Sequence, residues 1–154
     1  MWILANYIND FAKGRLIQLA TLPLGTDSLV AVMLLASGLP ADNTMRRTQY
    51  LSGVFSAGAA EANFTNYSRT SFTGAGITIT VNTSTDVVTL DTSNVVITAA
   101  GGATNASLGK LILIYKPTSS TADSACPVIS QHDFVCSTTG GTLTATVPSI
   151  GTAT

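Results

Sequence analysis

The stretch Leu108-Gly-Lys-Leu-Ile-Leu-Ile-Tyr-Lys-Pro117 decides the fold. Residues 111–115 are all apolar or aromatic, so a strand here presents apolar side chains on both of its faces. Such a strand is buried on both sides and lies inside a sheet that is covered twice. Its β-branched and aromatic content favours strand over helix, and Pro117 ends it because proline has no N–H to donate.

Other segments of the chain extend this sheet. The run at 29–35 is also apolar on both faces and predicts a second central strand. Residues 77–81 and 142–147 alternate between apolar and polar, and 87–90 is the return strand of a hairpin with 77–81. Further short strands are expected at 61–71, 95–98, 126–129 and 133–136. This spacing predicts an all-β fold, an antiparallel β-sandwich of jelly-roll-like architecture, although other antiparallel sandwiches fit nearly as well.

One short helix is expected within the β body. Asp42-Asn-Thr44 offer side chains suited to an N-cap, and Gly58 is a suitable stop. The apolar residues between these points fit about three turns. The sequence therefore predicts a single helix around residues 45–56.

The two ends of the chain are less well determined by pattern. Residues 1–24 are expected to form an apolar arm that docks on a neighbouring subunit, or a helix, which leaves 25–154 as a single sandwich domain. The tail from Pro148 has little to hold it unless a partner does.

The chain carries few charges. Only 10% of its 154 residues are charged, against about a quarter in an ordinary soluble protein, and the net charge is −1. Apart from Arg46-Arg47 there is no basic cluster, which argues against a nucleic-acid partner. No apolar run approaches the roughly 20 residues that span a bilayer, and the N-terminus lacks a basic signal-peptide start. We expect synthesis in a cytoplasm, no membrane partner, and a surface covered by other subunits.

Few residues could carry chemistry. His132 is the only histidine, and Asp133 points to the opposite face of a strand, which is unsuited to a Ser–His–Asp triad. Cys126, His132 and Cys136 are ligands that zinc accepts, but their spacing matches no zinc motif well and a fourth ligand is missing. A disulfide would need a turn near 130–131; we interpret the cysteines as reduced and buried. We expect no catalytic residue, no cofactor and no metal; a hydrolase or metal enzyme using His132 is the remaining alternative.

Four stretches carry a resemblance. They are Lys13-Gly-Arg-Leu with Leu19-Ala-Thr-Leu-Pro23, Ser28-Leu-Val-Ala-Val-Met-Leu-Leu35, Glu61-Ala-Asn-Phe-Thr-Asn-Tyr-Ser-Arg69, and Gly101-Gly-Ala-Thr-Asn-Ala-Ser-Leu-Gly-Lys-Leu-Ile-Leu-Ile-Tyr-Lys116. Together they resemble small structural proteins of tailed bacteriophages. Within the third stretch, Glu61 and Arg69 are expected to form an ordinary surface pair.

The resemblance implies a non-enzymatic virion component and a homo-oligomer, often a trimer. The expectation is a capsid decoration (cement) protein on the capsid exterior that binds the major capsid protein, assembled in the cytoplasm of a host bacterium. A tail fibre or minor tail protein that binds the host surface is the alternative. Aromatic and arginine side chains dominate interfaces, so we expect the contacts at Trp2, Tyr7, Phe11, Arg46 and Arg47.

The arm hypothesis predicts the effect of Trp2→Ala. Removing this anchor should lower the occupancy of the protein on particles, while the thermal unfolding of the β body stays unchanged. Occupancy is measured by gel densitometry of purified particles after titration with each protein. Equal occupancy of the substituted and unsubstituted proteins would contradict the assignment of Trp2.

Overall fold

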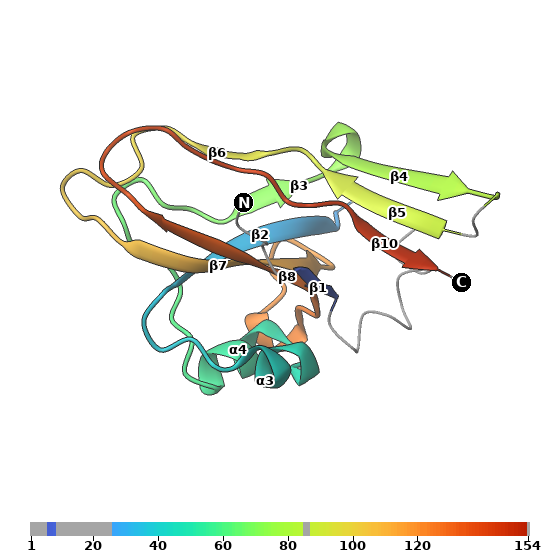
Figure 1. Cartoon of the computed structure of the whole chain (residues 1–154), viewed down its shortest axis with the longest axis horizontal. Helices are drawn as coiled ribbons and strands as arrows, with labels where there is room; N and C mark the ends of the chain where they lie inside the picture. The colour runs from blue at the N-terminus through green and yellow to red at the C-terminus, as the bar shows by residue number, and fades with distance from the viewer. Residues whose placement is uncertain (1–5, 9–25, 85–86, 154) are drawn as a thin grey trace.

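The computed structural model describes residues 6–8, 26–84 and 87–153. The strands of this part are β1 (Asn6–Ile8), β2 (Ser28–Leu35), β3 (Thr70–Phe72), β4 (Ile77–Asn82), β5 (Val87–Thr92), β6 (Val95–Ile97), β7 (Ser107–Lys116), β8 (Val128–Ser137), β9 (Leu143–Ala145) and β10 (Ile150–Ala153). They form three antiparallel sheets with the orders β1-β8-β7-β2-β3, β10-β5-β4 and β6-β9. The expected β class with antiparallel sheets is confirmed (Figure 1).

Strands β7 and β2 form the centre of the largest sheet and are buried on both faces. They pair antiparallel from Ser28 with Lys116 to Leu35 with Leu108. Because side chains alternate along a strand, Leu111 and Leu113 enter one core cluster while Ile112 and Ile114 enter the other. The prediction of two central strands covered on each side is therefore confirmed.

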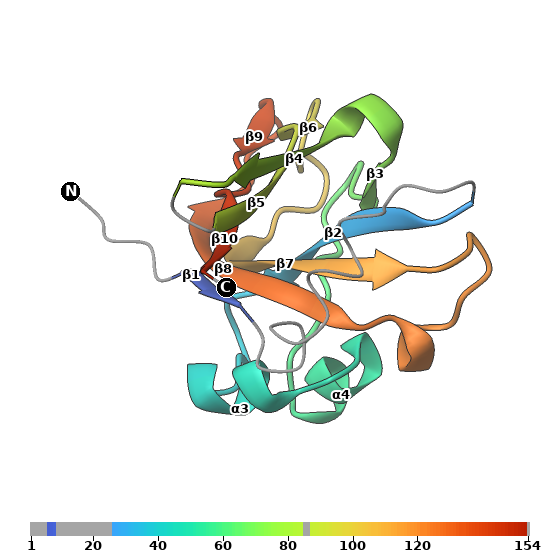
Figure 2. The same cartoon turned by 90° about the vertical axis from the view of Figure 1, so that its right-hand side faces the viewer.

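Each face of this sheet has a different cover. On one side lie the two smaller sheets, which contribute Leu90, Val95 and Ala145 to the core. On the other side lie two short helices, α3 (Asp42–Arg47) and α4 (Leu51–Ser56), which contribute Met45 and Val54. Figure 2 shows the helices below the sheet and β4, β5, β6 and β9 above it. The chain also forms two single turns of 3₁₀ helix, η1 (Gly74–Gly76) and η2 (Asp123–Ala125).

The prediction of one helix over 45–56 is wrong, because the chain is extended between α3 and α4. The carbonyl of Gln49 accepts a bond from the N–H of Val128 at 3.0 Å, and the N–H of Leu51 donates to the carbonyl of Cys126 at 3.0 Å. This pairing with the start of β8 holds residues 48–50 out of the helical conformation. The expected side-chain caps are also absent: Ala41 precedes α3 and no side chain caps it.

Three strand predictions need correction. Only Thr70–Phe72 of the expected strand 61–71 is a strand, since Asn66 has a left-handed φ of 68° and Tyr67 closes a turn onto Phe64. The expected strands 126–129 and 133–136 are one strand, β8, whose register with β7 shifts twice. The tail is held by its own chain, since β10 pairs with β5 and buries Ile150.

Part of the predicted N-terminal arm belongs to the main sheet. The backbone of β1 pairs antiparallel with β8, with Tyr7 opposite Gln131. The predicted anchors Trp2 and Phe11 lie outside the described residues, as does most of the segment 1–24.

Burial on both faces predicts equal sensitivity of the two cores. Leu113→Ala and Ile112→Ala should each lower the free energy of unfolding by about 2–5 kcal/mol, because each side chain is fully buried. Val135→Ala is the control, since this strand side chain is 81% exposed and should change stability by less than about 0.5 kcal/mol. Urea unfolding measures all three; a small loss for either core variant would contradict two-sided burial.

Candidate functional site

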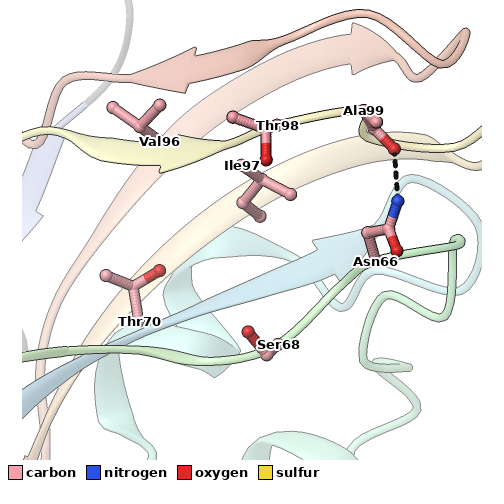
Figure 3. A pocket seen from close by; sticks show the side chains of 7 residues that line it. All are labelled: Asn66, Ser68, Thr70, Val96, Ile97, Thr98 and Ala99. Atoms are coloured by element: carbon pink, nitrogen blue, oxygen red, sulfur yellow. Dashed lines mark hydrogen bonds between the residues drawn. The ribbon is translucent and has the colours of Figure 1, made fainter.

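A shallow groove of about 380 Å³ opens between β6 and the segment that leads into β3. Figure 3 shows the seven side chains that line it. They are Asn66, Ser68, Thr70, Val96, Ile97, Thr98 and Ala99. Strand β3 ends the five-stranded sheet and β6 pairs only with β9 among the described strands. Each wall therefore includes part of an open strand edge, Thr70 of β3 on one side and Val96 and Ile97 of β6 on the other, with backbone N–H and C=O groups able to pair with an added strand.

Two residues with unusual backbone conformations stand at one end of this groove. Asn66 and Ala99 have φ values of 68° and 50°, and they are the non-glycine residues of the described chain with positive φ. The amide Nδ2 of Asn66 donates a 2.9 Å hydrogen bond to the carbonyl of Ala99, as Figure 3 shows. Asparagine tolerates this region, whereas alanine there costs roughly 1–2 kcal/mol. Strained residues of this kind cluster at binding sites, which makes this end of the groove the best candidate.

Backbone pairing between two loops holds this end in place. The N–H of Thr65 donates to Thr104 and the N–H of Gly101 donates to Thr65, both at 3.0 Å. Gly101 has a φ of 92°, and a Cβ there would lie 2.3 Å from the side chain of Asn105, so only glycine fits. The stretches 61–69 and 101–116 thus meet beside the groove. The sequence marks both stretches but gives no sign of their contact.

Arg69 anchors the wall that carries Ser68 and Thr70. Its guanidinium makes two hydrogen bonds to Glu61, at 2.8 and 2.6 Å, and two to Asp123, at 2.7 and 2.9 Å. Arg69 lowers the pKa of the Asp123 carboxyl by donating to it. The expected pair with Glu61 exists, but it is half-buried and belongs to a larger network that ties the wall to η2.

Tyr67 connects this network to the central sheet. Its hydroxyl donates to Glu61 at 2.9 Å and accepts a hydrogen bond from the backbone N–H of Met33 at 3.1 Å. Burial raises the pKa of the Tyr67 phenol, so it remains a donor at neutral pH. The hydroxyl of Tyr67 therefore connects the groove wall to β2 by hydrogen bonds.

The lining of the groove has no charged side chain. It combines hydroxyl and amide groups with the aliphatic side chains of Val96 and Ile97. Such a surface suits an uncharged ligand that offers hydrogen bonds, since an ionic ligand would lose hydration without gaining a partner. The arrangement is suited to binding an extended, neutral segment.

His132 lies inside β8, on a different strand from the groove. It is 4% exposed, and its Nε2 lies 2.9 Å from the hydroxyl of the fully buried Ser130. Burial, and then the charge of Lys110, lowers the pKa of His132 to about 4, so the ring is neutral at pH 7. Ser130 carries the hydroxyl that could act as a nucleophile beside His132. Its side chain is fully buried and does not contact solvent.

The charged residues next to His132 belong to a cluster of ion pairs around Lys110. Asp133 contacts the amino group of Lys110, which also lies 2.8 Å from Asp42 of α3. Lys110 is buried in β7, and the two carboxylates raise its pKa above its usual value despite the opposing effect of burial. These three residues join β7, β8 and α3.

The candidate zinc ligands are not brought together. Within the described part of the chain, no group of three or more His, Cys, Asp or Glu side chains could hold a metal ion. Cys126 and Cys136 are free thiols, as expected, but only Cys126 is buried and Cys136 is half-buried. Burial raises the pKa of both thiols, so neither is a reactive thiolate at neutral pH.

Arg46 and Arg47, the predicted interface residues whose side chains the structure describes, do not form one patch with the groove. Arg46 is half-buried and Arg47 exposed, both in the last turn of α3. Helix α3 lies on the opposite side of the main sheet from β6 (Figure 2). The signals that could have found the groove are weak: asparagine at 66 is compatible with a left-handed turn, whereas nothing marks Ala99.

Neither family models, nor curated proteins, nor solved structures match this chain. None of the helices in the described residues is long and apolar enough to cross a bilayer.

The depressed pKa of His132 predicts an acid-sensitive fold. Between pH 6.5 and 4 the unfolded chain binds a proton at this residue while the folded protein does not, so stability falls as the pH falls. The loss approaches about 3 kcal/mol at pH 4. Urea unfolding from pH 7 to pH 4 measures it, with His132→Gln as the comparison. Identical slopes for the two proteins across this window would contradict a buried, neutral His132.

Proposed function

We propose that this protein is a non-enzymatic structural subunit of a bacteriophage virion. Its role is that of a capsid decoration protein, which binds the assembled lattice of the major capsid protein from the outside. A ligand that binds only the assembled lattice stabilises it by mass action. The phage resemblance of 61–69 and 101–116 supports this role, and both stretches adjoin the groove.

The observation that carries the proposal is where the charges lie. The chain has 7 basic and 8 acidic residues, which makes 15 in all. Six of them are paired in two networks, Lys110 with Asp42 and Asp133, and Arg69 with Glu61 and Asp123. Lys110 is buried and the other five are half-buried, so the exterior carries fewer fully exposed charges than the composition indicates. Such an exterior suits a protein whose surface is covered by neighbouring subunits, because charged residues are depleted at the centre of interfaces.

We assign the contact with the capsid to the groove. Its open strand edges and uncharged lining fit an extended segment of the capsid subunit, which would add a strand to β3 or to β6. The homo-oligomer, in the form of a trimer, and the jelly-roll-like sandwich belong to the same proposal. Support for the sandwich comes from the antiparallel sheets that face each other across the larger core cluster.

A second role keeps the protein on the virion but places it in the tail, as a fibre or minor tail protein that binds the host surface. The lining favours this alternative in one respect: hydroxyl and amide groups also hydrogen-bond saccharides. The lining has no aromatic side chain on which a sugar ring could stack, which favours the capsid role.

Imaging of native particles tests the location. Density for this protein should lie on the capsid facets, and purified protein should saturate particles that lack it. Density along the tail, together with binding to a glycan array, would replace the decoration role with the second one.

Thr98→Arg tests the groove. An arginine there places a charge in the neutral lining and should weaken particle binding at least tenfold, measured as occupancy in a titration. Thr146→Arg is the matched control, because Thr146 is also an exposed threonine but lies outside the lining. If the two variants bind equally well, the groove is not the contact surface.

A further inference from the structure

Strand β4 forms a long open edge of its sheet among the strands that the structure describes. It ends the sheet β10-β5-β4 and pairs with β5 over six consecutive residues without a register shift. The strands at the other sheet ends in the described chain, β1, β3, β6, β9 and β10, have only three or four residues. Proteins protect sheet edges with charges, proline, bulges or shortness, because a regular open edge pairs with other chains. The sequence Ile77-Thr-Ile-Thr-Val-Asn82 uses none of these devices.

The side chains of β4 are largely accessible. Thr78, Thr80 and Asn82 are exposed, and Val81 is 63% exposed even though it is an apolar residue. Figure 1 shows β4 on the outer side of β5, away from β10. Pairing of this edge with another chain would bury the apolar surface of Val81 as well as satisfy the backbone groups of β4.

The sequence of β4 is complementary to itself. In an antiparallel pair of two copies centred on Thr80, Thr80 lies opposite Thr80 of the second copy and Ile79 lies opposite Val81. Thr78 then lies opposite Asn82, so polar residues meet polar ones and apolar residues meet apolar ones. No charge occurs in β4 to repel its copy.

The nearest charge on the sheet does not oppose this pairing either. Asp91 lies on β5, next to Thr78 of the same copy. Four strands in the order β5-β4-β4-β5 place the two β5 strands about 14 Å apart, beyond the screening length of roughly 8–10 Å at physiological salt.

We infer that two copies of this chain join along β4 around a two-fold axis. The result is one six-stranded antiparallel sheet in the order β10-β5-β4-β4-β5-β10. Two-fold contacts that use the same patch twice are the commonest form of self-association. This contact does not rest on the capsid role, and it links either two single subunits or two trimers.

Cross-linking of Thr80→Cys tests the two-fold axis directly, because a bond between the same residue in two copies requires that symmetry. Mild oxidation or a short bismaleimide should convert most of this variant into a covalent dimer on a non-reducing gel. Val135→Cys is the control, since that strand position is highly exposed and lies on β8. The unsubstituted protein measures the background from Cys126 and Cys136. A yield for Thr80→Cys no higher than for Val135→Cys overturns the inference.

Thr80→Lys tests the same contact without chemistry, because it places two like charges opposite each other on the axis. The mass in solution, measured by light scattering, should fall by half. The unfolding midpoint of Thr80→Lys should equal that of the control Thr146→Lys. An unchanged mass, or an unsubstituted protein that is monomeric, overturns the inference. Binding of Thr80→Lys to particles is measured separately, so a failure of the capsid role and a failure of this contact are distinguishable.

Discussion

The structure depends on two adjacent strands, β7 and β2, that are apolar on both faces. Neither face can remain in water, so the remaining chain has to supply two covers. The helices α3 and α4 supply one, and the smaller sheets supply the other. Lys110 is the exception within β7, since it brings a charge into a buried strand. Asp42 and Asp133 neutralise that charge, and because Asp42 belongs to α3, the same contact fixes where the helix docks.

The groove is a consequence of how the second cover is built. Two separate small sheets lie over the main sheet instead of one continuous sheet, so strand edges remain open where they approach β3. The hydrogen bond between Asn66 and Ala99 closes one end of this gap. The network of Arg69, Glu61 and Asp123 keeps the facing wall rigid. A groove that is held this firmly before binding loses little conformational entropy when it takes up a partner segment.

The sequence predicted what depends on local alternation and missed what depends on distant pairing. The strands β2 and β7 and the hairpin of β4 and β5 follow from the apolar pattern alone. The interruption between α3 and α4 does not, because it results from backbone bonds to residues more than 70 positions away. Strand β8 was predicted as two short strands because Ser130, Gln131 and His132 between them are polar, yet all three are buried in a strand between β7 and β1. The contacts of Asn66 with Ala99 and of Arg69 with Asp123 likewise have no local signal.

The distribution of polar groups links the fold to the two associations that we propose. Six charged residues are paired in two networks, and polar residues such as Ser130 and His132 occupy the interior of β8, while β4 and the groove are uncharged. Association through such surfaces relies on backbone hydrogen bonds and side-chain fit more than on charge attraction. It is therefore weakly sensitive to salt, because screening acts on charges and leaves strand pairing intact. A neutral exterior also offers little repulsion between copies, and β4 is the longest of the strands that end a sheet in the described chain, which favours it for pairing between copies.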